Sequence, residues 1–374
     1  MKQYLNGSET KMNNITEDKI TGLLCSLYEK YGYNRFKMNK FEQYSLYLEN
    51  KDFLTSDRIV TFTDNTGRLL ALKPDVTLSI VKGAVDKKSE CEKVYYNENV
   101  YRASKDGEFR ELTQVGVECI AHIDLYSVFE VIVLAHKSLS YISDEYLLAL
   151  SHMRFISAAL GGIEDAGVKK RILECISKKN VHTLKAILAE NNVGAGLSEC
   201  LTVLASLFGD VDTCIEKLCE ISVNEETDKV LCELKRLSSL LKSAGLYAKT
   251  VMDFSIVNDM SYYNGITFQG FINGISQSVL SGGEYGKLLE KFSSKLDAVG
   301  FAVYIDALER LTAKKSFDAD VFVLYSDSSD AEKLYACIDR LIASGVSVRS
   351  GRTLPGRVRC KRIMKFDGEV LTDE

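Results

Sequence analysis

The stretch KVYYNENVYRASKDGEFRELTQVGVECI, residues 93–120, decides which fold the sequence predicts. Residues 93–102 and 110–120 are rich in Val, Tyr and Thr, which favour β-strands. The residues between them, 103–108, are mostly polar and contain Gly107, which is typical of a connection between two strands. We therefore predict a β-hairpin with a long tip.

One face of the second strand is unusual because it carries polar side chains. Since successive side chains of a strand point to opposite faces, Leu112, Gln114, Gly116 and Glu118 share one face. If that face is exposed, Gln114 and Glu118 are simply solvated. If it is buried, they form the floor of a polar pocket. The strand pattern by itself leaves both interpretations open.

Helices and strands alternate irregularly on both sides of this hairpin. Apolar residues at helical or alternating spacing, together with turn residues, mark the other elements. In chain order the predicted elements are a helix at 16–31, strands at 58–63 and 68–73 around the turn Asp64-Asn-Thr-Gly67, a helix at 76–88, a helix at 126–141, a leucine-rich helical stretch at 161–248, strands at 250–257, 266–272 and 277–281, a strand running into a helix at 299–311, and a β-α-β unit at 320–325, 331–344 and 346–349.

Composition excludes several classes of protein. With 374 residues and a net charge of −5, the chain is long enough for two or three domains and lacks the basic excess of a broad nucleic-acid binder. The first ten residues are polar, and no apolar run approaches the length of a membrane span, so we expect neither a signal peptide nor a membrane anchor. Without a secretion signal, the ten cysteines are expected to be reduced thiols in the cytoplasm, and because they form no CxxC pair we expect no metal site.

Three groups of residues could bind a small polar ligand. Asp75 and Thr77 follow a predicted strand and could hold an ammonium group, although this stretch taken alone favours a helix start that Asp75 caps. Arg102 ends the first strand of the central hairpin. It could take a carboxylate while Glu118 takes the cationic end of a zwitterion, or the two could form an internal ion pair.

The third group is aromatic. Tyr262 and Tyr263 precede a turn and a strand, so they could form a wall for a flat ring or pack in the core. The glycine pair of Gly282-Gly-Glu-Tyr285 permits close approach of a ligand to the backbone. Arg310 lies in the last predicted helix, where it could contact a phosphate or be solvated.

In order and spacing these pieces resemble the catalytic core of class II aminoacyl-tRNA synthetases, specifically the histidyl branch, from about residue 16 to 311. Residues 99–118 look like the second motif of the class, residues 299–310 like the third, and residues 31–42 like the first. The Lys-Pro-Asp-x-Thr and Tyr-Tyr-Asn-Gly stretches look like the two histidine-recognition segments of the family. Carried over position by position, the resemblance implies a histidine site made of Asp75, Thr77, Arg102, Gln114, Glu118, Tyr262 and Tyr263.

The same resemblance implies an α+β fold. Its core, residues 1–317, is expected to be a class II synthetase-like antiparallel sheet flanked by helices, with a helical insertion at 161–248. A short C-terminal βαβ segment at 318–374 is expected to follow. This segment is about half as long as the anticodon-binding domain of the family, so the resemblance does not extend to tRNA reading.

The departures from the family pattern concern positive charge. The family carries Arg where this chain has Asn258, Glu108 and Glu284, and an Asp where it has Ser261. Amino-acid activation passes through a phosphoryl transfer whose negative charge must be stabilised by positively charged groups. The loss of one such group costs about 10²-fold or more in rate. In the segment that resembles the first motif, Asn39 stands where the family has Pro. The resemblance therefore does not extend in detail to the family's dimer interface.

A retained pocket without these charges resembles the regulatory subunits of ATP phosphoribosyltransferase, a paralogous branch of the histidyl synthetases. That resemblance implies a non-catalytic, cytoplasmic chain without cofactor or metal. It implies three further features: a short-form catalytic phosphoribosyltransferase partner, L-histidine as effector in the first step of histidine biosynthesis, and self-association through the synthetase-like core. An active histidyl-tRNA synthetase-like enzyme is the alternative, and a scaffold with an empty pocket is a third possibility.

Overall fold

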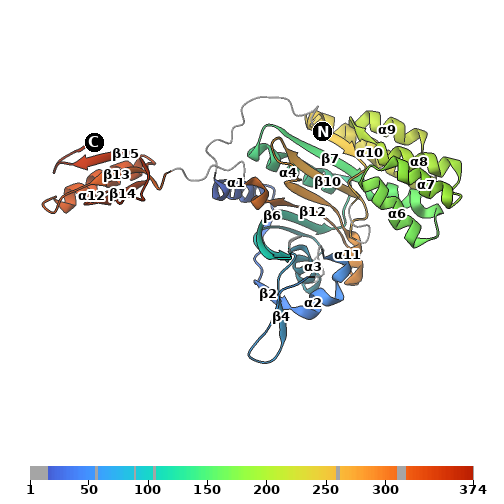
Figure 1. Cartoon of the computed structure of the whole chain (residues 1–374), viewed down its shortest axis with the longest axis horizontal. Coiled ribbons are helices and arrows are strands. Elements are labelled where there is room, and N and C mark those ends of the chain that lie inside the picture. Colours follow the sequence, from blue (N-terminus) through green and yellow to red (C-terminus); the bar gives the residue numbers. More distant parts are fainter. Residues whose placement is uncertain are drawn as a thin grey trace. The chain divides into compact units, whose positions relative to one another are not determined.

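The computed structural model describes residues 16–54, 58–87, 90–103, 107–257, 262–309 and 317–373. It divides into two compact units, Met1–Thr312 and Ala313–Glu374, which we describe separately (Figure 1). Four predictions made above, for the first ten residues, Asn258, Ser261 and Arg310, concern positions outside the described residues.

The first unit is built on a nine-stranded sheet (Figure 1). Seven longer strands form the central part of the sheet, and a two-residue strand lies at each edge. In spatial order the strands are β1 (Asn34–Arg35), β5 (Glu92–Ala103), β6 (Phe109–Ala121), β12 (Asp297–Tyr304), β11 (Leu280–Glu284), β10 (Ile266–Ile272), β7 (Tyr146–His152), β9 (Thr250–Asp253) and β8 (Phe208–Gly209). Only the pairs β1–β5 and β7–β9 are parallel. The predicted central hairpin is confirmed as β5–β6.

One face of the sheet is covered by α1 (Glu17–Lys30) and α4 (Leu125–Ile142), both at the predicted places. They share a hydrophobic core with the strands, in which Leu24, Ile132 and Phe301 are almost completely buried. By length and composition α4 is the one described helix that could cross a membrane. Half of its span is buried in this unit, so it serves here as the central core helix.

The opposite face of β5, β6 and β12 is covered by a smaller assembly. It contains a three-stranded sheet and several short helices, and its core includes Tyr47, Val81 and Leu288. The elements are β2 (Phe41–Gln43), α2 (Tyr44–Glu49), η2 (Lys51–Phe53), β3 (Thr61–Thr63), β4 (Leu69–Leu72), α3 (Thr77–Asp86) and α11 (Gly286–Lys291). The 3₁₀ turn η5 (Ile305–Leu308) packs instead in the core on the other face, where it contacts α1. The predicted strands at 58–73 are thus shorter than expected, and the helix expected after residue 304 is a 3₁₀ turn in the described part.

Between β7 and β9 the chain forms the predicted helical insertion, which gathers at one end of the sheet (Figure 1). Its own core is rich in leucine and cysteine. The elements are α5 (Met153–Ala159), η3 (Leu160–Gly162), α6 (Ala166–Ser177), α7 (Val181–Glu190), α8 (Ala195–Ser206), α9 (Val211–Glu220), α10 (Glu225–Ser243) and η4 (Tyr247–Lys249). The two-residue strand β8, which interrupts these helices, pairs with β9 and extends the sheet.

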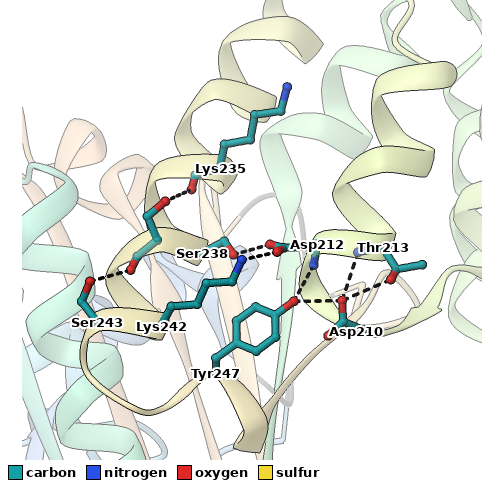
Figure 2. Close-up of polar contacts among 9 residues, drawn as sticks. Asp210, Asp212, Thr213, Lys235, Ser238, Lys242, Ser243 and Tyr247 are labelled. Carbon is teal, nitrogen blue, oxygen red and sulfur yellow. Dashed lines mark hydrogen bonds and ion pairs between the residues drawn. The ribbon is translucent and has the colours of Figure 1, made fainter.

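A polar network fixes the last two helices of the insertion to each other (Figure 2). Asp210 caps α9, and the hydroxyl of Tyr247 donates a hydrogen bond to its Oδ1 at 2.8 Å. The same hydroxyl accepts the backbone N–H of Asp212 at 3.1 Å. On α10, Ser238 and Lys242 both bind the Asp212 carboxylate. One end of α9 is therefore held against the last turns of α10.

The second unit has a four-stranded sheet in the order β14-β13-β15-β16 with one helix. Its elements are β13 (Ala319–Leu324), α12 (Ala331–Ala343), β14 (Val348–Gly351), β15 (Cys360–Phe366) and β16 (Leu371–Asp373). The predicted β-α-β unit is confirmed because β13 and β14 are parallel, although β14 begins two residues later than expected. Val323, Met364 and Phe366 form its small core.

Replacing Tyr247 by Phe removes both hydrogen bonds of its hydroxyl. We expect Tyr247→Phe to lower the free energy of unfolding by about 1 kcal/mol, which thermal or urea unfolding would measure. Tyr126→Phe is the control, because Tyr126 is 65% exposed and no hydrogen bond of its hydroxyl is found among the described residues. Equal stability of the two variants would show that the network contributes nothing.

Candidate functional site

A cavity of about 420 Å³ lies over β6, β11 and β12, on the face covered by the small assembly. All the site residues predicted from the sequence line it, namely Asp75, Thr77, Arg102, Gln114, Glu118, Tyr262 and Tyr263. They come from α3 and the turn before it, from both strands of the central hairpin, and from the segment before β10. Gln114 and Glu118 are only 4% and 2% exposed, so the pocket-floor interpretation of this strand face is correct.

The carboxylate of Glu118 is the most deeply buried charged group of the cavity. Thr77 donates a hydrogen bond to its Oε1 at 2.7 Å, and the hydroxyl of Tyr285 donates one to its Oε2 at 2.5 Å. No ion pair of this carboxylate is found in the described part of the chain. Burial without a cation raises the pKa of Glu118 to about 8, although the two hydrogen bonds oppose the shift. At neutral pH the empty pocket therefore favours a protonated Glu118.

Asp75 and Arg102 form the charged end of the cavity. Asp75 Oδ1 accepts the backbone N–H of Leu78 at 2.9 Å, so the capping role considered from the sequence is real. Its Oδ2 lies 3.6 Å from Nη2 of Arg102, whose Nε donates to the carbonyl of Pro74 at 2.8 Å. Burial raises the pKa of Asp75, and Arg102 opposes that shift. The internal Arg102–Glu118 pair considered above is wrong, because Arg102 pairs with Asp75 instead.

Three tyrosines form an aromatic wall. The ring of Tyr262 lies with its centroid 4.6 Å from that of Tyr263 and 5.5 Å from that of Tyr285. Burial raises the pKa of all three phenols, so they remain neutral hydroxyls that can donate hydrogen bonds. A flat ring of a ligand could pack against this wall.

Glycines keep the floor of the cavity open. A Cβ atom on Gly300 would lie 1.8 Å from Oε2 of Glu118, and one on Gly116 would lie 2.2 Å from the carbonyl of Phe301. A Cβ atom on Gly282 would lie 2.3 Å from the carbonyl of Gly300. Since these contacts involve backbone or a buried carboxylate, no side chain fits at the three positions. Of the three positions, Gly300 is the one beside the Glu118 carboxylate.

The sequence analysis missed part of the wall. Tyr285, Tyr96 and Tyr304 line the cavity but were not predicted as site residues. For Tyr285 a signal was available, because it follows the glycine pair that was singled out for close approach to a ligand. Nothing in the sequence pattern distinguishes Tyr96 and Tyr304 from ordinary strand residues.

Two of the positions where the family's positive charge is missing, Glu108 and Glu284, do not line the cavity. Glu108 is exposed near the tip of the β5–β6 hairpin and does not line it. Oε1 of Glu284 accepts the backbone N–H of Ile266 at 2.7 Å, and its side chain lines a different cavity. The argument from lost charge therefore has no geometric support at Glu284.

The cavity can hold a small zwitterion with a ring. Arg102 offers a guanidinium for a carboxylate, Asp75 and Gln114 offer oxygen atoms for an ammonium group, and Glu118 faces the aromatic wall. The described residues contain no group of His, Cys, Asp and Glu side chains that could hold a metal ion.

Comparison with known proteins identifies a family and several relatives. The model of the histidyl-tRNA synthetase family matches residues 12–308. An ATP phosphoribosyltransferase regulatory subunit of Clostridium acetobutylicum is 28% identical over 346 residues, which cover 88% of this chain and 84% of the relative.

Solved structures share the fold. A Bacillus halodurans protein described as an ATP phosphoribosyltransferase regulatory subunit/histidyl-tRNA synthetase has a TM-score of 0.75 and 24% identity, over 91% of this chain and 92% of that one. A chain of the ATP phosphoribosyl transferase (HisG:HisZ) complex of Thermotoga maritima has a TM-score of 0.61 and 18% identity, over 78% of this chain and 97% of that one. These likenesses confirm the predicted class II synthetase fold.

The pKa of Glu118 predicts how stability of the empty protein depends on pH. Because the folded pKa of about 8 exceeds the ordinary value of 4.5, the stabilising contribution is complete below about pH 4.5 and is lost as the pH rises to about 8. We expect Glu118→Gln, which stays neutral, to unfold at a temperature that declines less between pH 5 and 8. If the melting temperatures of the two proteins change by the same amount between pH 5 and 8, the pKa of Glu118 is not raised.

Proposed function

This chain belongs to the histidyl-tRNA synthetase family, and from that membership we propose that it is the non-catalytic regulatory subunit of an ATP phosphoribosyltransferase and binds histidine. The observation that supports the ligand most is the complete amino-acid cavity, with an acidic, a basic and an aromatic part. The relatives named as regulatory subunits, matched over most of both chains, support the role.

In the proposed complex each part of histidine meets a complementary group. The carboxylate lies at Arg102, and the ammonium group lies near Asp75 and Gln114. The imidazole packs against Tyr262 and Tyr263, with a ring N–H donated to Glu118. A cationic or N–H-donating ligand favours the ionised form of Glu118, so histidine binding is expected to release the proton that the empty pocket holds.

The proposed partner is a short-form catalytic phosphoribosyltransferase chain, which carries out the first step of histidine biosynthesis in the cytoplasm. The name of the Thermotoga maritima complex supports an assembly of two kinds of chain. Histidine then acts as effector by binding one of two states of the assembly more tightly. We also propose self-association through the synthetase-like core and no role in tRNA reading.

An active histidyl-tRNA synthetase-like enzyme is the second candidate, favoured by the family match and by the retained Arg102. Asn258 replaces the family's Arg in the sequence, and this substitution argues against adenylate formation. The two candidates share the amino-acid site and differ only in the chemistry performed there.

Calorimetry with L-histidine tests the site. We expect Glu118→Gln to weaken histidine binding about 10-fold or more, because a buried ligand N–H loses its charged acceptor. Glu111→Gln on the same strand is the control, since Glu111 is exposed and lies outside the cavity. Wild-type protein that binds no histidine, with or without the catalytic chain, would contradict the proposal.

Histidine-dependent exchange of pyrophosphate into ATP separates the two candidates. We expect no exchange above background by the purified chain, because the family's activating Arg is replaced at Asn258. Restoring the Arg with Asn258→Arg is the matched variant, and the active synthetase of a related organism is the positive control. Robust exchange by the wild-type chain would establish the synthetase instead.

A further inference from the structure

The segment that carries Tyr262 and Tyr263 is attached to the end of β11 chiefly through one residue, Glu284. The backbone carbonyl of Glu284 accepts the N–H of Asn264 at 3.0 Å, and its Oε1 accepts the N–H of Ile266 at 2.7 Å. One residue therefore binds two amides of the same segment, one through its backbone and one through its side chain. Both amides belong to residues that follow shortly after the two tyrosines of the aromatic wall.

The side-chain contact continues the pairing of β10 and β11 beyond its last pair of residues. Toward the tyrosines, that last pair is Thr267 opposite Gly283. The next amide along the chain is that of Ile266, which the Glu284 carboxylate binds. The carboxylate thus adds one cross-strand hydrogen bond at the point where the chain leaves the sheet to form the aromatic wall.

Gly265 lies between the two bound amides and leaves room for the carboxylate. A Cβ atom on Gly265 would lie 2.3 Å from Oε1 of Glu284 and 2.8 Å from its Oε2. The length of the side chain at position 284 matters as well. Asp is one methylene shorter and would not reach the Ile266 N–H, whereas Gln presents a carbonyl oxygen at the same distance. The contact therefore requires Glu or Gln at position 284.

The two tyrosines also pack on this end of β11. A Cβ atom on Gly283 would lie 2.8 Å from Cδ1 of Tyr263, so the ring of Tyr263 rests on the strand backbone. The ring of Tyr262 lies with its centroid 5.5 Å from that of Tyr285. The position of the aromatic wall is thus set by the three consecutive residues 283–285.

Glu284 itself does not line the amino-acid cavity. It is paired with Val299, and Val299 is paired with Cys119, the residue after Glu118. Since neighbouring residues of a strand point to opposite faces, Glu284 and Glu118 point away from each other. Any effect of Glu284 on a ligand in the cavity therefore passes through the segment that it binds.

We propose that Glu284 is the positioning residue of the aromatic wall. By binding the amides of Asn264 and Ile266, it fixes Tyr262 and Tyr263 in the orientation in which they pack against an imidazole ring. The effect on binding rests on the proposed histidine site, whereas the contact itself does not. The carboxylate acts here as a hydrogen-bond acceptor, which the Arg carried by the family at this position could not supply.

Amide hydrogen exchange of the full-length protein without ligand tests the contact. We expect peptides covering residues 262–266 to exchange about 10-fold faster in Glu284→Ala and Glu284→Asp, because the Ile266 N–H loses its acceptor, and at the wild-type rate in Glu284→Gln. Glu290→Ala is the matched control, since Glu290 is exposed on α11 and no hydrogen bond of its carboxylate is found among the described residues. Unchanged exchange in folded Glu284→Ala would overturn the proposal, whether or not the protein binds histidine.

Calorimetry with L-histidine tests the effect on the site. We expect Glu284→Ala to bind histidine about 10-fold more weakly than the wild type, and Glu284→Gln to bind it as tightly as the wild type does. Combined with Tyr263→Leu, Glu284→Ala should cost much less, because a ring that Glu284 positions is gone. Additive losses, or an equal loss in Glu284→Gln, would overturn the positioning role. If the wild type binds no histidine, the proposed function fails, and the exchange rates alone decide whether Glu284 holds the segment.

Discussion

The burial of one carboxylate on a central strand governs the architecture around it. Glu118 sits in the middle of β6, where a charged group is costly unless it is hydrogen-bonded. Thr77 at the start of α3 and Tyr285 after β11 supply hydroxyls to its two oxygens. Elements far apart in the chain therefore meet at this group, and glycine at position 300 leaves room above it. The cavity exists because these requirements are met together.

The sheet separates two chemical environments. On one face, Glu118, Asp75 and Arg102 lie with tyrosines in a cavity suited to an amino acid. On the other face, cations of the helical insertion surround a cavity that Glu284 closes. Glu284 and Tyr285 are consecutive residues at the end of β11, so the same short segment contributes one side chain to each cavity.

The structure changes what two of the three missing positive charges imply about a non-catalytic role. In the sequence, three positions lacked positive charge, and each was interpreted as a loss beside ATP. Glu284 in fact faces the opposite side of the sheet, and Glu108 is exposed near a hairpin tip. The proposed non-catalytic role therefore rests mainly on the relatives and on Asn258, whereas the proposed amino-acid ligand rests on the residues that line the cavity.

The sequence by itself determined the central hairpin, the helical insertion and seven of the residues that line the first cavity. It could do so because alternation fixes which side chains of a strand share a face, and because motif order places the segments in a known fold. Only the tertiary structure decided that Arg102 pairs with Asp75, that Tyr96 and Tyr304 join the wall, and which face Glu284 occupies. These depend on which strands become neighbours and in what register, and local periodicity contains no information about either.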